Sequence, residues 1–290
     1  MPGFAELYGK LERKISLSGK SLSTLNSYGT HLAKLALHFG CVPTELDADQ
    51  IDDYLYLLQR QHNTPSDSYF KFTVYGLRYV FRMEGLRDKH IELPMIKHEK
   101  KLPIVLSRQE VKRLLKAPQL LKHRILLGLL YGCGLRCFEV RNIMLCDLDF
   151  DRQKLHVRKG KGKKDRYVPL SPILIRGLQT YIEAEQPTEW LFNGKPELQA
   201  GGDFDSRYSQ RGVQWAVNQA KKAAGITKEM SVHTLRHTFA THLLEDGLDI
   251  MSIKDLLGHE CIDTTLVYLH VAQNGRMKPF SPLDTLYKKD

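Results

Sequence analysis

The sequence predicts a mainly helical protein of two domains, a helical N-terminal bundle followed by a mixed α/β domain with a small antiparallel sheet. Apolar residues recur at helical spacing over most of the 290 residues. Residues 145–170 differ, because apolar and polar side chains alternate there in short runs separated by turns. A chain of this length can bury two separate cores, so two domains are expected.

The first half predicts helices at about 4–16, 21–39, 47–60 and 65–84. Ser21, Asp47 and Pro65 stand near helix starts, and Gly40 and Gly85 stand at helix ends. We expect residues 1–92 to form this domain, with its aromatic side chains in the core and in helix contacts rather than in a base-stacking platform. These aromatic residues are Tyr54, Tyr56, Tyr69, Phe70, Phe72, Tyr75, Tyr79 and Phe81.

A linker is expected over residues 93–106, where the helical period is lost and two prolines bracket a basic cluster. Lys100 and Lys101 belong to this cluster and are candidates for contact with phosphate, although a solvated linker explains them equally well. Ser107 and Glu110 then form a capping-box pattern at the start of the next helix.

The second domain is expected over 107–272. Helical patterns cover 107–117, 120–132, 171–185, 207–224, 233–246, 249–257 and 263–270, with three strands within 145–170 and a loop around 186–206. In the tail, 273–290, Pro279 and Pro282 exclude one continuous helix.

Composition favours a polyanionic partner in the cytoplasm. Lys and Arg outnumber Asp and Glu by 43 to 33, which gives a formal charge of +10. The five cysteines form no CxxC pair, which is typical of reduced thiols. There is no secretory h-region and no apolar run of membrane-spanning length, so we expect a cytoplasmic protein without membrane contact.

Basic residues are concentrated around a glycine-flanked turn with Lys161 at its tip. Glycine lets the backbone approach a ligand closely, so the turn suits a mobile contact with a phosphate backbone, although a solvated basic loop would look the same. The other candidates for DNA contact here are Lys159, Lys163, Lys164 and Arg166. The turn lacks the GxxxxGK[ST] pattern of nucleoside triphosphate sites.

The stretch HTLRHTFATHLL, residues 233–244, places His233 and His237 four residues apart, as in helical zinc sites. A zinc protease needs HExxH, but Thr234 stands where the glutamate would be. The scattered cysteines offer no obvious third ligand. The sequence therefore predicts no metal and no cofactor.

A different set of residues suits phosphoryl transfer from DNA to a protein nucleophile. Two guanidinium groups can neutralise the charge that develops on a phosphodiester under attack, and each such donor is worth about 3 kcal/mol. The candidate catalytic residues are Arg136, Lys161, His233, Arg236, His259 and Tyr268.

These residues stand in GLRCFEV, RKGKGKKDRYVPL, HTLRHTFATHLLEDGLDI and IKDLLGHECIDTTLVYLHV, which resemble the successive motifs of the tyrosine recombinases, the phage integrase family. Their order and separations match, including the nine residues from His259 to Tyr268. The resemblance implies a catalytic domain of the DNA breaking-rejoining type. It also implies that the helical first half is a DNA-binding core-binding domain, a SAM-like bundle.

By this resemblance Tyr268 attacks the scissile phosphate and forms a 3′-phosphotyrosyl bond. A phenol with its usual pKa of roughly 10 is a poor nucleophile and needs help. Arg136 and Arg236 hold the non-bridging oxygens, and Lys161 is the general acid for the departing 5′-oxygen.

His233 is implied to assist the tyrosine in acid–base chemistry, and His259 to hydrogen-bond the phosphate. Glu139 matches an acidic position of the family and is expected to orient its neighbours. His237 and His242 match no catalytic position, so we expect them to pack or cap locally.

The implied activity is site-specific DNA recombination for integration, excision or resolution of DNA elements, without metal or ATP. The implied partner is double-stranded DNA with a specific site. A homotetramer, or a heterotetramer with a paralogue, is expected on DNA, and a monomer or weak dimer elsewhere. The size resembles Xer recombinases, whereas SPLD in the tail resembles integron-type integrases, and the prolines there put a long exchanged C-terminal helix in doubt.

Two alternatives remain at this point. A type IB topoisomerase shares the tyrosine chemistry but relaxes supercoils, and the helical N-terminal domain and short chain favour a recombinase over it. A DNA-binding regulator could keep the fold without catalysis, but all six catalytic-type positions are filled here.

Overall fold

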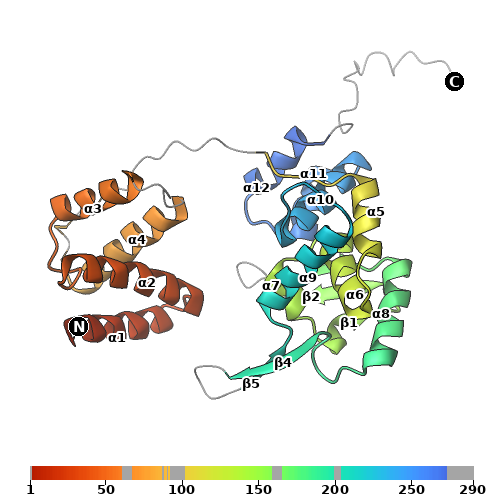
Figure 1. The fold of residues 1–290 in the computed structure, drawn as a ribbon, viewed down its shortest axis with the longest axis horizontal. Coiled ribbons are helices and arrows are strands. Elements are labelled where there is room, and N and C mark those ends of the chain that lie inside the picture. Colours follow the sequence, from red (N-terminus) through yellow and green to blue (C-terminus); the bar gives the residue numbers. More distant parts are fainter. Residues whose placement is uncertain are drawn as a thin grey trace, which may run out of the picture. The chain divides into compact units, whose positions relative to one another are not determined.

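A computed structural model of the chain describes residues 2–60, 67–86, 88–89, 91, 102–158, 165–198 and 204–272. The chain divides into two compact units, Met1–Glu99 and Lys100–Asp290, and each is described by itself (Figure 1). Lys100 and Lys101 lie outside the described residues. None of the helices in the described ranges combines the length and the apolar character needed to cross a bilayer.

The first unit consists of the four expected helices. They are α1 (Pro2–Leu17), α2 (Leu22–Phe39), α3 (Ala48–Arg60) and α4 (Asp67–Met83). The Ser21 hydroxyl accepts a hydrogen bond from the Thr24 amide at 3.2 Å and caps the start of α2. Gly40 ends that helix in the left-handed conformation, φ 69°.

The core of the first unit is formed by the inward faces of these helices, with fully buried side chains such as Leu35, Ile51 and Leu77. Burial of each such side chain contributes about 1.5–3 kcal/mol. Tyr54, Phe70 and Phe81 are buried, as expected. The expectation of a core position was wrong for Tyr56 and Tyr75, which are exposed. Phe72 is also partly exposed, but it makes a helix contact, because its ring centroid lies 5.8 Å from that of His31 on α2.

The second unit contains the expected helices with small shifts at their ends. They are α5 (Arg108–Lys116), α6 (Leu121–Gly132), α8 (Pro172–Glu185), α9 (Gln210–Ala223), α10 (Val232–Glu245) and α11 (Ile250–Leu257). The predicted capping box at α5 is confirmed: the Ser107 amide donates to Glu110 at 2.7 Å, and the Glu110 amide donates to the Ser107 hydroxyl at 3.2 Å.

The predicted three-stranded antiparallel sheet is also confirmed. Its strands β1 (Leu148–Asp149), β2 (Lys154–Val157) and β3 (Arg166–Pro169) pair in the order β1-β2-β3. Val157 of β2 lies opposite Arg166 of β3, so the segment predicted as a basic turn falls between two paired strands in the sequence. Lys161 and its neighbours Lys159, Lys163 and Lys164 lie outside the described residues.

Three elements differ from the prediction. The expected loop at 186–206 contains a hairpin, β4 (Asn193–Leu198) with β5 (Phe204–Arg207), so α9 begins only after its cap at Ser209. A short helix, α7 (Cys137–Arg141), precedes the 3-10 turn η1 (Leu145–Asp147). The predicted helix at 263–270 is split into α12 (Asp263–Leu266) and the 3-10 helix η3 (Val267–His270).

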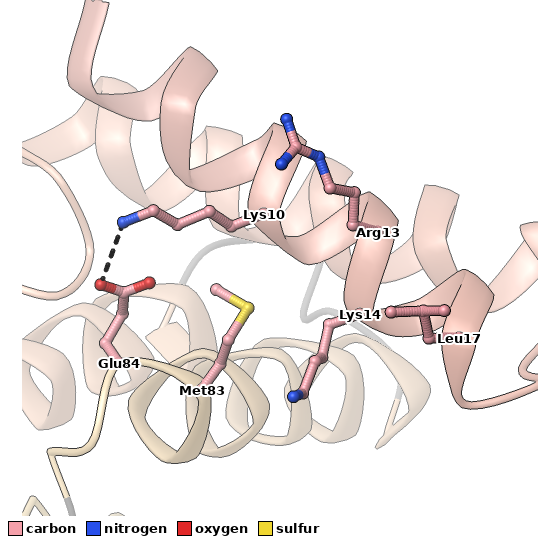
Figure 2. A pocket seen from close by; sticks show the side chains of 6 residues that line it. All are labelled: Lys10, Arg13, Lys14, Leu17, Met83 and Glu84. Carbon is pink, nitrogen blue, oxygen red and sulfur yellow. Dashed lines mark hydrogen bonds and ion pairs between the residues drawn. The ribbon is translucent and has the colours of Figure 1, made fainter.

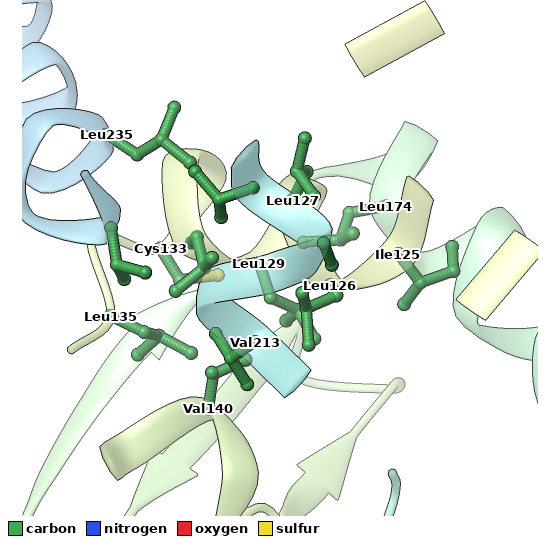
Figure 3. Packing of buried hydrophobic residues seen from close by; sticks show 14 of the residues in the cluster. Ile125, Leu126, Leu127, Leu129, Cys133, Leu135, Val140, Leu174, Val213 and Leu235 are labelled. Carbon is green, nitrogen blue, oxygen red and sulfur yellow. The ribbon is translucent and has the colours of Figure 1, made fainter. Parts of the chain in front are cut away.

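The main core of the second unit surrounds α6 (Figure 3). Leu126, Leu127 and Leu129 of α6 belong to one buried cluster with Val213 of α9 and Leu235 of α10. A second cluster contains Phe239 of α10 together with Leu257 and Tyr268. Helix α10 therefore contributes side chains to both clusters.

Gly134, in the turn between α6 and α7, is expected to tolerate no side chain. Its φ is +60°, and an added Cβ would lie 2.7 Å from Cε1 of the Phe239 ring. Gly134→Ala should lower the free energy of unfolding by about 1–2 kcal/mol, because the left-handed backbone is unfavourable for alanine. Overpacking against Phe239 should lower it by about 1–3 kcal/mol more.

The matched control is Gly225→Ala. Gly225 has φ +64°, but no atom lies within 4 Å of an added Cβ. Urea unfolding should therefore show a larger loss of stability for Gly134→Ala than for Gly225→Ala, and equal losses would contradict the packing at this turn.

Candidate active site

The turn after α6 presents Arg136 at the N-cap of α7. Arg136 and Glu139 are joined twice, by the Arg136 amide donating to Glu139 Oε2 at 2.8 Å and by Arg136 Nη1 donating to Oε1 at 2.7 Å. Because one carboxylate holds both the backbone and the side chain, the direction of the Arg136 guanidinium is fixed.

Glu139 also binds Arg166 of β3. Arg166 Nη1 and Nη2 donate to the two carboxylate oxygens at 2.9 and 2.8 Å, and Arg236 Nη1 lies 3.8 Å from Oε2. Burial tends to raise the pKa of Glu139, but hydrogen bonds and charge from Arg166 and Arg136 lower this pKa to about 2. The carboxylate is thus ionised at neutral pH and lies within ion-pair distance of three arginines.

The structure places Arg166 in a different position from the one that the basic cluster suggested. Besides its two bonds to Glu139, its Nε donates to the Leu256 carbonyl at 2.8 Å, and the side chain is largely buried. Arg166 is therefore directed inward. It links β3 to α7 and to the end of α11, so its guanidinium is engaged within the protein, although the sequence suggested a DNA contact.

Arg236 of α10 is buried beneath the same turn. Its Nη1 donates to the Gly134 carbonyl at 2.7 Å, and its Nη2 donates to the Leu257 carbonyl at 2.5 Å. Burial, followed by the positive charge of Arg136, lowers the pKa of Arg236 to about 9. The guanidinium therefore still has its charge at neutral pH and is held by two backbone acceptors.

Tyr268 of η3 is fully buried, with 1% of its surface exposed. Its phenol oxygen lies 3.1 Å from Nδ1 of His237, which is on α10. Only local packing or capping was expected for His237, and its ring contacts one of the candidate catalytic residues. For His242 the prediction is confirmed, since its Nδ1 lies 2.9 Å from the Tyr131 hydroxyl, away from the other candidate residues.

One cavity of about 470 Å³ brings together five of the six candidate catalytic residues. It is lined by Arg136, His233, Arg236, His259 and Tyr268, and also by His237, Glu260 and Asp263. Lys161, the sixth, lies outside the described residues.

The two other histidines of the cavity differ in their surroundings. Burial, then the charges of Arg236 and Arg136, lower the pKa of His233, so its ring is neutral at neutral pH. His259 follows Gly258, the left-handed cap of α11, and its Nδ1 lies 2.8 Å from the Thr265 hydroxyl. That contact fixes the plane of the His259 ring at the wall of the cavity.

The described residues contain neither a grouped metal site nor a disulfide bond. Among the residues that the structure describes, no three or more His, Cys, Asp or Glu side chains are grouped as a metal site would require. All five cysteines are free.

A second cavity, of about 420 Å³, lies in the first unit between α1 and the end of α4 (Figure 2). Lys10, Arg13 and Lys14 line it, and Lys10 pairs with Glu84 at 3.4 Å. Cations line this cavity, but it contains no histidine, tyrosine or cysteine that could act as a nucleophile or a base.

Glu139 should contribute to stability in a way that depends on pH. Its pKa of about 2 is below its ordinary value of 4.5, and this gap corresponds to about 3 kcal/mol. Since the folded-state pKa is the lower one, the contribution is complete above about pH 4.5 and is lost as the pH falls towards 2.

Denaturant unfolding at several pH values should therefore show the wild type losing about 3 kcal/mol more than Glu139→Gln between pH 5 and 2. At neutral pH the variant should already be less stable by about 3–5 kcal/mol, because a buried arginine loses its counter-charge. Parallel pH curves for the two proteins would contradict the ionised state of Glu139.

Comparison with known proteins identifies the family of the chain. The model of the phage integrase family matches residues 105–274. An integrase/recombinase of Sinorhizobium fredii is 35% identical over 280 residues, which cover 96% of this chain and 88% of the relative. The tyrosine recombinase XerA of Thermococcus kodakarensis is 36% identical over 269 residues, covering 92% of this chain and 91% of that protein.

Solved structures share the fold. The XerH site-specific recombinase in a post-cleavage complex with palindromic difH substrate superposes with a TM-score of 0.69 at 22% identity, covering 88% of this chain and 78% of that chain. A crystal structure of XerA recombinase gives a TM-score of 0.51 at 24% identity, covering 98% and 97%.

Proposed function

The chain belongs to the phage integrase family of tyrosine recombinases, and from this premise we propose that it is a site-specific DNA recombinase that cuts and rejoins strands through a 3′-phosphotyrosyl intermediate. One observation supports this most strongly. The cavity in the second unit combines a phenol, two guanidinium groups and imidazole rings, drawn from segments more than a hundred residues apart in the chain.

The arrangement suits attack on a phosphodiester. Arg136 and Arg236 are fixed by Glu139, Gly134 and Leu257 before any substrate binds. Preorganised cations of this kind stabilise the charge on the equatorial oxygens of the transition state and need no metal to do so.

The reaction exchanges one ester for another. The phenol oxygen of Tyr268 forms a bond to phosphorus, the bond from phosphorus to the 5′-oxygen breaks, and Lys161 gives that oxygen its proton. His259 donates a hydrogen bond to a non-bridging oxygen. Because the phosphotyrosyl bond retains the energy of the diester, attack by another 5′-hydroxyl rejoins the strand without ATP.

The comparisons favour recombination over the two alternatives. Relatives named recombinases match 92–96% of this chain, including the first unit. A regulator without catalysis has no need for a buried tyrosine beside a neutral histidine and two arginines.

The proposed partner is double-stranded DNA with a specific recombination site. Lys159, Lys163, Lys164, Lys100 and Lys101 are proposed to contact its phosphates. We propose a tetramer on DNA, made of this chain alone or with a paralogue, and a monomer or weak dimer when free. The same cleavage and rejoining reaction can serve integration, excision or resolution of DNA elements. We propose a cytoplasmic, nucleoid-associated location, where the DNA partner would be found.

The proposal is tested by covalent trapping. Duplexes that the protein binds are first selected from a random-sequence pool and prepared with a nick. The protein is then incubated with these nicked duplexes in a buffer that contains a chelator and no ATP. The expected result is an adduct that survives denaturation and is removed by protease. If an adduct forms only when a divalent metal is added, the metal-free mechanism is wrong.

A further inference from the structure

Helix α10 directs two histidines, His233 and His237, at the cavity from positions one turn apart. Of these, His237 contacts the Tyr268 phenol: its Nδ1 lies 3.1 Å from the phenol oxygen. The family resemblance implied acid–base help from His233, whereas the ring in contact with the reacting oxygen belongs to the other histidine.

The phenol of Tyr268 has little contact with bulk solvent, because the residue is 1% exposed, and His237 is within hydrogen-bond distance of the phenol oxygen. Burial raises the pKa of Tyr268, against the opposing charges of Arg236 and Arg136, so the resting phenol is protonated. Burial, then the neighbouring His233 and Arg236, lower the pKa of His237, so the ring has a free nitrogen lone pair at neutral pH.

We infer that His237 is the base that takes the phenolic proton of Tyr268 during strand cleavage. This rests on the function proposed above. As the bond from Tyr268 Oη to phosphorus forms, the proton moves to Nδ1 of His237, and the bond to the 5′-oxygen breaks with a proton supplied by Lys161. On rejoining, the His237 imidazolium returns its proton to the phenol oxygen as the tyrosine leaves.

If His237 takes the phenolic proton, His233 is available to interact with the bound phosphate. Besides His237 and Tyr268, the charged and titratable groups that line the cavity are His233 and Arg236 from α10, Arg136 at the N-cap of α7, His259, Glu260 and Cys261 from the segment before α12, and Asp263 at the start of α12. A bound phosphodiester adds negative charge among these cations, which stabilises the imidazolium at the moment it forms.

The test is the single-turnover rate of adduct formation on the nicked duplexes selected from the random pool. His237→Asn retains a polar atom near the place of Nδ1 but cannot accept a proton at neutral pH. Adduct formation should slow by about 10²- to 10⁴-fold, with unchanged affinity for the duplex. The rate of the variant should also continue to rise at alkaline pH, where hydroxide replaces the base.

The matched control is His242→Asn, on the same helix. His242 also contacts a tyrosine hydroxyl, at 2.9 Å, but Tyr131 is not among the residues that line the cavity. This variant should lose similar stability and form adducts at a rate within threefold of the wild type. His237→Gln serves as a second variant if His237→Asn does not fold, with the same expected loss.

A more acidic phenol at position 268 distinguishes a chemical role of His237 from a role in packing. Fluorotyrosine at position 268 should recover much of the rate in His237→Asn, because a phenol that ionises more readily needs less help from a base. Equal slowing with tyrosine and fluorotyrosine, or a His237→Asn rate within threefold of the wild type, would overturn the inference. If the wild type itself forms no adduct, the proposed function fails instead.

Discussion

Tyr268→Phe should bind its DNA site normally and form no covalent adduct. The substitution removes only the phenol oxygen, which is the proposed attacking atom. The lost hydrogen bond to His237 should cost about 1 kcal/mol of stability, so the variant should stay folded. Gel-shift affinity and denaturing-gel adduct yield measure the two expectations separately.

Tyr131→Phe is the matched control for this experiment. Tyr131 is a partly buried tyrosine, and its hydroxyl likewise contacts a histidine of α10, His242, at 2.9 Å. It should lose similar stability and retain adduct formation. An adduct in the Tyr268→Phe protein would remove Tyr268 as the nucleophile.

Arg236→Lys should reduce the rate of adduct formation by about 10²-fold or more, which corresponds to about 3 kcal/mol of transition-state stabilisation. Lysine has the same charge, but one ammonium cannot hold both the Gly134 and Leu257 carbonyls and also present a fork to phosphate. Single-turnover rates measure the loss.

The control for Arg236 is Arg108→Lys, at an exposed arginine paired with Asp246 at 2.7 Å. Solvent and salt screen a surface pair of this kind, so it contributes little, and stability and rate should hardly change. Denaturant unfolding of both variants shows whether the Arg236→Lys protein is folded in the assay. A rate for Arg236→Lys within threefold of the wild type would contradict the role of the guanidinium fork.

Much of the fold follows from local signals in the sequence. The capping box of Ser107 and Glu110, the left-handed Gly40 and the alternation over 145–170 each specify one element, and each is found where expected. The hairpin of β4 and β5 was missed because NGKPEL contains a proline and does not alternate apolar and polar residues.

At the candidate site, the sequence could not predict contacts between segments that are distant in the chain. Arg166 was grouped with the basic turn by its place in the sequence, but Glu139, 27 residues earlier, draws it inward. His237 was set aside because no motif gave it a role, and its contact with Tyr268 spans 31 residues. Only the packing of α10 against η3 brings these two rings together.

The most direct test of the account is to identify the protein atom bonded to DNA in the adduct of the wild-type protein. Protease and nuclease digestion followed by mass spectrometry should give one peptide, with Tyr268 linked to a 3′-phosphate, and a free 5′-hydroxyl on the other DNA end. A nucleotide attached to any other residue, or a 5′-phosphate linkage to Tyr268, would contradict it.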